Sequence, residues 1–117
     1  MPFFQSNPRV VALMPHPDDI EILCAGTLLR LKESGAQIHL ATMTAGDKGS
    51  ATHPRQEIAA IRRAEAQNAA QILGAASYSC LEFSDLEITF DNESRRRVSE
   101  FLREIDPFLV FTTPPAD

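Results

Sequence analysis

Segments typical of buried strands alternate along this chain with segments typical of amphipathic helices. Residues 9–14, RVVALM, form a continuous apolar run, as expected of a strand covered on both faces. A helical pattern follows over 18–33. The further strands are expected at 37–43, 77–83 and 107–112, and the further helices at 55–73 and from Asp91 or Asn92 onward. This alternation predicts an α/β fold in which helices cover both faces of a mostly parallel sheet.

The connections between these segments restrict the order of the strands. Right-handed crossovers in a doubly wound sheet give the order 3-2-1-4, a Rossmann-like three-layer αβα arrangement that is truncated after the fourth strand. The winding reverses between the first and fourth strands, and ligands of such sheets bind beyond the carboxyl ends of the strands at that switch point. Because we find no repeat and no linker, we expect a single domain over residues 1–117.

Composition excludes several classes of partner. The net charge of −5 argues against nucleic acid, since phosphate binding needs a clustered basic surface, and we expect the one basic cluster, Arg95 to Arg97, to be a solvated helix face. No apolar stretch approaches the ~18 residues of a transmembrane helix. Cys24 and Cys80 are interpreted as small buried hydrophobic residues in a reducing environment, which predicts a cytoplasmic protein.

The first strand–helix junction has the sequence PHPDD, with His16, Asp18 and Asp19 at the switch point. Either aspartate could act only as an N-cap or complement the dipole of the helix. Helix capping does not account for a histidine at the carboxyl edge of a sheet beside two acids. Imidazole and carboxylate both bind Zn²⁺, and a free carboxylate nearby could accept the proton of a bound water, so the triplet favours a metal site.

The segment PHPDDIEILCAGTLLRL resembles the signature of the LmbE/PIG-L family of zinc-dependent N-acetylglucosaminyl deacetylases. Four further segments resemble that family in the same order: TAGDKGS, IRRAEAQNAAQILG, FSDLEI and DPFLVFTTPPAD. The resemblance implies that His16 and Asp19 bind Zn²⁺ or another divalent metal and that Asp18 is the general base. The implied reaction is hydrolysis of the acetamido group of a small N-acetyl-sugar conjugate.

Three further residues are candidates for binding the substrate. On helix 55–73 we expect Arg62 and Glu65 to lie beside an apolar stripe, where a charged pair is costly unless its members are paired. They could form a structural salt bridge, or, as the family's RxxE pattern implies, Arg62 could donate to sugar hydroxyls while Glu65 orients it. Asp85 is either a turn residue or an acceptor for a sugar hydroxyl, and Leu86 stands where the family usually has glycine. The predicted stripe comprises Ile58, Ile61, Glu65, Ala69 and Ile72.

The third zinc ligand implied by the resemblance is the first histidine of an HPDH-type motif, and the sequence stops at Asp117 before that motif. We therefore expect this chain to be the N-terminal portion of a deacetylase, to be inactive alone, and to self-associate through an unpaired sheet edge. His39 is expected to be a packed strand residue, and His53 is a weak candidate for a replacement ligand.

Two other classes of protein remain to be compared with a deacetylase. The chain could be a non-catalytic Rossmann-like module that binds sugar or another partner without turnover. A dinucleotide-binding domain is disfavoured, because PHPDD occupies the turn where a G-x-G-x-x-G loop would hold a pyrophosphate.

Overall fold

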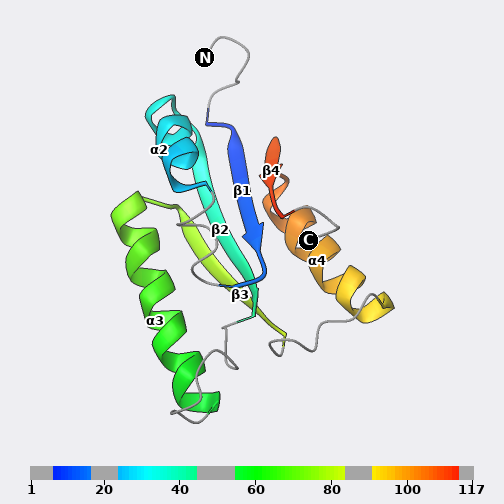
Figure 1. The fold of residues 1–117 in the computed structure, drawn as a ribbon. Coiled ribbons are helices and arrows are strands. Elements are labelled where there is room, and N and C mark those ends of the chain that lie inside the picture. Colours follow the sequence, from blue (N-terminus) through cyan, green and yellow to red (C-terminus); the bar gives the residue numbers. More distant parts are fainter. Residues whose placement is uncertain (1–6, 17–23, 45–54, 84–90, 114–117) are drawn as a thin grey trace.

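The computed structural model describes residues 7–16, 24–44, 55–83 and 91–113, and the statements below concern these residues (Figure 1). The strands are β1 (Arg9–Met14), β2 (Gln37–Thr44), β3 (Ser77–Phe83) and β4 (Leu109–Phe111). The helices are α2 (Ala25–Glu33), α3 (Arg55–Leu73) and α4 (Asn92–Ile105). None of these helices is both long enough and apolar enough to cross a membrane.

The four strands form one parallel sheet in the order β3-β2-β1-β4, which confirms the predicted α/β class and strand order. β1 is central: Val11 is in register with His39 of β2 on one side and with Val110 of β4 on the other. Its five residues from Val10 to Met14 are all buried. The continuous apolar run of β1 is therefore explained by helices on both faces of the sheet.

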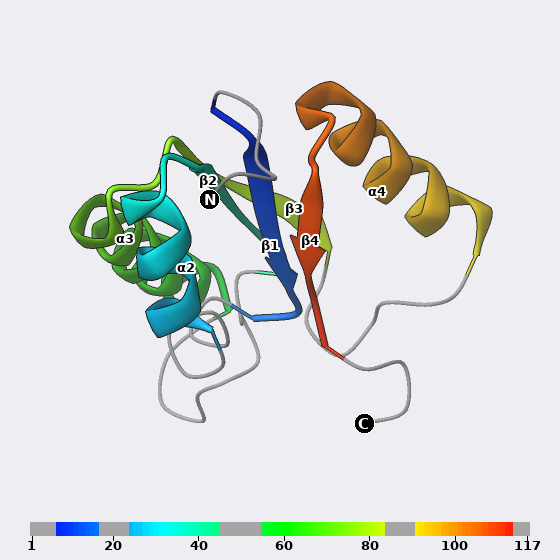
Figure 2. The same cartoon turned by 90° about the horizontal axis from the view of Figure 1, so that it is seen from above.

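The helices form two layers on opposite faces of the sheet (Figure 2). α2 and α3 cover one face, where Val10, Ala12 and Met14 of β1 pack with Leu28 of α2 and Leu73 of α3. α4 covers the other face, where Val11, Leu13 and Ala41 pack against one side of α4. Alternate residues of β1 thus belong to two separate cores, as the two-residue period of a strand requires.

Two glycines end the helices of the first layer as the sequence predicts. Gly35 follows α2 with a φ of 102°, and Gly74 follows α3 with a φ of 78°. Both angles lie in the left-handed region, which glycine adopts without steric cost. The side chain of Lys32 lies across Gly74, so that a Cβ at this position would come within 2.5 Å of the Lys32 Cε. The Lys32 side chain is flexible and can move aside, so it is the left-handed φ of Gly74 that makes glycine the favoured residue in the turn after α3.

α4 begins as predicted, with Asp91 as the N-cap: its carboxylate accepts from the backbone N–H of Ser94 at 2.8 Å. The expectation of a fully solvated Arg95–Arg97 cluster is only partly right. Arg96 is exposed and bonded to Glu93 and Glu100, but the guanidinium of Arg97 lies over the ring of Phe83 at 4.0 Å from its centroid. Arg97 therefore connects α4 to the end of β3 through a cation–π contact.

The predicted apolar stripe of α3 is partly wrong. Ile58 is buried as expected, but Ile61 is 40% exposed and Ile72 is 87% exposed. The side that faces the sheet carries Ile58, Ala66, Ala70 and Leu73. α3 is rich in alanine, and apolar residues recur with a 3.6-residue period on two neighbouring sides of it, so the period alone does not show which side faces the sheet. Close packing against the sheet favours the side that carries the small alanines.

Candidate active site

The carboxyl end of β1 is held in place by the end of β2. The backbone N–H of Thr44 donates to the Pro15 carbonyl at 3.0 Å, and the Thr44 hydroxyl donates to the same oxygen at 3.1 Å. Thr44 is completely buried, so this double contact is shielded from water. The chain therefore leaves the sheet at a fixed point, and His16 follows directly as a partly buried residue.

This exit point lies beside the switch point of the sheet. β1 has β2 on one side and β4 on the other, and Ala12 is in register with Phe111, the last residue of β4. The segments that follow these two strands leave the sheet at the same edge. His16 follows β1, and Thr112 and Thr113 follow β4. The structure thus confirms the predicted location of His16 at the carboxyl edge, where doubly wound sheets bind their ligands.

The other residues predicted for the metal site and one predicted for the substrate site lie outside the described residues. These are Asp18, Asp19 and Asp85, together with the candidate replacement ligand His53. Within the part of the chain that the structure describes, no three His, Cys, Asp or Glu side chains are grouped closely enough to hold a metal ion. The roles of these four residues stay predictions.

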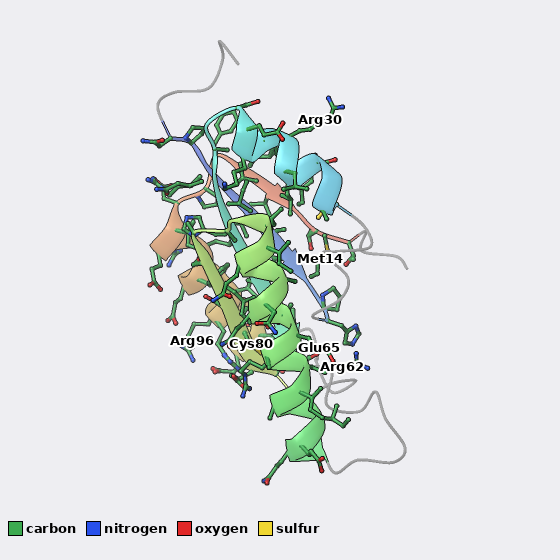
Figure 3. The ribbon with its side chains drawn as sticks, turned by 90° about the vertical axis from the view of Figure 1, so that its left-hand side faces the viewer. Met14, Arg30, Arg62, Glu65, Cys80 and Arg96 are labelled. Atoms are coloured by element: carbon green, nitrogen blue, oxygen red, sulfur yellow. The ribbon has the colours of Figure 1, made fainter. Side chains whose placement is uncertain are left out.

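Arg62 and Glu65 are brought together on α3, with 3.7 Å between Arg62 Nη1 and Glu65 Oε2. Figure 3 shows both side chains extending from the same side of the helix. The Arg62 side chain is 33% exposed and that of Glu65 is 60% exposed. An ion pair this accessible to water adds little to stability, so both groups remain available to a ligand in solvent.

A second ion pair, which the sequence analysis missed, connects α3 to β3 next to Arg62. Arg63 Nη2 donates to both carboxylate oxygens of Glu82 at 2.8 Å. Glu82 lies near the end of β3, where the pairing with β2 shifts register, and has a left-handed φ of 65°. Arg63 and Glu82 are 19 positions apart in different elements, so their spacing in the sequence does not indicate that they are in contact. This contact joins α3 to the sheet one residue from Arg62, and with side chains that are 37% and 59% exposed it is as accessible to water as the Arg62–Glu65 pair.

His39 and Cys24 have the packing contacts that the sequence analysis expected of structural residues. His39 lies within β2, away from the carboxyl edge, and its Nδ1 is 2.6 Å from the Ser77 hydroxyl. Cys24 precedes α2 and packs against the core on that face, and burial raises the pKa of its thiol. A raised pKa disfavours the thiolate, which is the reactive form of cysteine, and this agrees with a structural role for Cys24.

Comparison with known proteins gives a consistent result. The family model described as GlcNAc-PI de-N-acetylase (PIG-L) matches residues 11–117. The diacetylchitobiose deacetylase of Thermococcus kodakarensis is 30% identical over 114 residues, which is 96% of this chain and 43% of that protein. A probable N-acetyl-alpha-D-glucosaminyl L-malate deacetylase 2 of Bacillus anthracis is also 30% identical, over 92% of this chain and 50% of that protein.

A solved structure extends the similarity to three dimensions. The N,N'-diacetylchitobiose deacetylase from Pyrococcus horikoshii superposes with a TM-score of 0.87 at 32% identity, covering 98% of this chain and 46% of that one. The chain therefore spans about half the length of the relatives that it matches.

Proposed function

Since the chain belongs to the GlcNAc-PI de-N-acetylase (PIG-L) family, we propose that it supplies catalytic residues of a metal-dependent deacetylase. The reaction is hydrolysis of the acetamido group of a small N-acetylglucosamine-type conjugate to an amine and acetate. One structural observation carries the proposal: β1 places His16 at the carboxyl edge of the sheet, beside the switch point, and in the sequence Asp18 and Asp19 follow it after Pro17. The names of the relatives, which refer to diacetylchitobiose and to N-acetyl-alpha-D-glucosaminyl L-malate, support this substrate class.

His16 and Asp19 would hold the metal, and the donor set fits zinc. One ligand is an imidazole held where β1 leaves the sheet, and the carboxylate follows three residues later. The Thr44 contacts to Pro15 limit the movement of the backbone immediately before His16. When bound, zinc would polarise the amide carbonyl and lower the pKa of a water molecule towards neutrality.

The remaining chemistry belongs to residues of this chain. Asp18, adjacent to Asp19, accepts the proton of the attacking water and passes it to the departing amine nitrogen. Arg62 donates to hydroxyls of the sugar, and Glu65 orients the guanidinium through the 3.7 Å ion pair. Asp85 accepts from a sugar hydroxyl. We place this reaction in the cytoplasm, a choice that the two free cysteines, Cys24 and Cys80, support.

The test is acetate release from N,N'-diacetylchitobiose by the complete gene product, with added zinc and after treatment with a chelator. We expect acetate release that chelation abolishes and zinc restores. Sugar binding by calorimetry without any acetate release would instead favour the non-catalytic binding module. Acetate release that persists in the chelated protein would contradict the metal-dependent mechanism.

A further inference from the structure

Thr44, the last residue of β2, holds the carbonyl group from which the chain passes to His16. The Thr44 backbone N–H donates to the Pro15 carbonyl oxygen at 3.0 Å, and the Thr44 hydroxyl donates to the same oxygen at 3.1 Å. The backbone bond extends the pairing of β1 with β2 beyond Met14 and Thr42, which are partners in the parallel ladder. A carbonyl oxygen can accept two hydrogen bonds, and Thr44 supplies both of these donors.

Fixing this carbonyl also restricts the peptide plane of His16. The Pro15 oxygen and the His16 nitrogen belong to one planar peptide unit, so two donors on the oxygen oppose rotation of that plane. On the other side, the sequence places Pro17 after His16, and a residue that precedes proline is restricted to extended backbone conformations. The direction in which the His16 side chain leaves the backbone is therefore restricted from both sides.

Thr44 is itself anchored within the sheet. It is completely buried, and its partner in β3 is Phe83, whereas the preceding pair is Thr42 with Cys80. Between these two pairs, β2 advances by two residues and β3 advances by three, so the strand beside Thr44 contains a bulge. Bulges are frequent next to active sites, where they redirect a side chain. The Thr44 hydroxyl thus acts from a position that the sheet determines.

Thr42 shows how a buried hydroxyl of β2 can be used for structure alone. It is also completely buried and lies two residues from Thr44 on the same face of the strand. Its hydroxyl is 2.9 Å from the hydroxyl of Tyr78, a contact that satisfies two polar groups between β2 and β3. Of these two threonines, it is Thr44 that contacts the residue before His16.

We propose that the Thr44 hydroxyl is a positioning group for the metal ligand, because by holding the Pro15 carbonyl it presents the His16 imidazole to the metal. This inference rests on the proposed function, since it requires His16 to bind the metal. A ligand whose backbone is already restricted loses less conformational freedom when the metal binds, so its affinity is higher than on an unrestrained chain. Thr44 acts through His16 and is not itself a ligand.

The experiment measures the zinc affinity of the complete gene product by competition with a chromogenic chelator, together with urea unfolding of the metal-free protein. Thr44→Val removes the hydroxyl but keeps the shape of the side chain and the backbone bond to Pro15. Thr44→Ser keeps the hydroxyl. Thr42→Val is the matched control, because it removes an equally buried hydroxyl from the same face of the same strand. His16→Ala reports whether the histidine binds zinc.

We expect Thr44→Val to weaken zinc binding about 10-fold, as when a group that orients a metal ligand is removed. Thr44→Ser should have an affinity close to that of the original protein. Thr42→Val should lower the stability to urea as Thr44→Val does, but it should leave the zinc affinity unchanged, because its hydroxyl does not contact Pro15.

An unchanged zinc affinity in Thr44→Val, while His16→Ala loses the metal, would overturn the role of Thr44 and leave the proposed metal site intact. Equal weakening by Thr42→Val and Thr44→Val would also overturn it, since the affinity would then follow general stability. A zinc affinity that His16→Ala does not change would contradict the proposed function itself, and the role of Thr44 with it.

Discussion

Asp18 is the residue on which turnover depends in the proposed mechanism. Replacing it with asparagine preserves the size of the side chain but removes the base that accepts the proton of the attacking water. We expect Asp18→Asn to lower kcat by about 100-fold or more, the usual contribution of a positioned general base. The measurement is acetate release by the complete gene product, with zinc content determined on the same samples.

The zinc content of the variants distinguishes the proposed base, Asp18, from the proposed metal ligand His16. Asp18→Asn should keep the metal, whereas His16→Ala should lose it, since His16 is proposed as a ligand and Asp18 is not. An Asp18→Asn protein with unaltered turnover would rule out Asp18 as the base.

Among the described residues, His39 is a group whose titration should couple stability to pH. Burial, and secondarily the positive charge of Arg9, lower its pKa from the ordinary value of 6.5. Its Nε2 is buried without a hydrogen-bond partner, which is consistent with a neutral ring. Above pH 6.5 the ring is neutral in both the folded and the unfolded chain, so its full contribution to stability is present. As the pH falls through 6.5 towards the lower folded pKa, the unfolded chain takes up the proton more readily and stability is lost.

The check is urea unfolding at several pH values between about 7.5 and 5, for the original chain and for His39→Gln. The original chain should lose stability on acidification more steeply than the variant, because glutamine does not titrate. Equal pH slopes for the two proteins would show that His39 does not have a lowered pKa in the folded state.

At the scale of helices and strands, the glycine that ends α3 allows a prediction about stability. Gly74 has a φ of 78°, and a Cβ there would lie 2.5 Å from the Lys32 side chain. Gly74→Ala should therefore lower the free energy of unfolding by about 1–2 kcal/mol, the cost of a left-handed non-glycine residue. Gly26 is the matched control: it lies in α2, and a Cβ there meets nothing within 4 Å.

We expect Gly26→Ala to raise the free energy of unfolding by about 0.4–1 kcal/mol, because alanine restricts the unfolded chain without strain in the helix. Urea unfolding of both variants provides the test. If Gly74→Ala leaves the free energy of unfolding unchanged or raises it, the turn after α3 does not require glycine.

Most element boundaries could be predicted because local signals mark them. Gly35 and Gly74 set the ends of two helices, and the Asp91 cap sets the start of a third. The fourth strand is shorter than predicted, Leu109–Phe111 in place of 107–112. It starts later because Pro107 has no N–H to donate, so that pairing begins with the Phe108 N–H donating to Arg9.

Features that depend on tertiary contacts could not be predicted. The buried side of α3 is one, since alanines and isoleucines alternate over neighbouring stripes and only docking on the sheet selects between them. The Arg63–Glu82 ion pair is another, because its partners come from different elements. For the candidate site, the sequence correctly placed His16 at the carboxyl edge and Arg62 beside Glu65. The roles assigned to Asp18, Asp19 and Asp85 remain predictions, as these residues lie outside the described parts of the chain.

At the scale of the whole molecule, the fold and the proposed chemistry are connected by one topological fact. β1 is the central strand beside the switch point, and the residue that follows it at the carboxyl edge is a histidine. A parallel sheet of this order brings the exits of β1 and β4 to the same edge, which is where doubly wound sheets bind their ligands and where we propose that the metal and the sugar bind. We therefore propose that His16, at this position, is a metal ligand.

The most direct measurement is zinc binding by calorimetry to the 117-residue chain, to His16→Ala and to His39→Gln. Loss of one ligand typically weakens a metal site severely, so His16→Ala should lower the zinc affinity by about 10-fold or more. His39→Gln removes a histidine that packs within β2, and it should leave the affinity unchanged. Zinc binding that is the same in the original chain and in His16→Ala across the whole titration would contradict the proposed metal site.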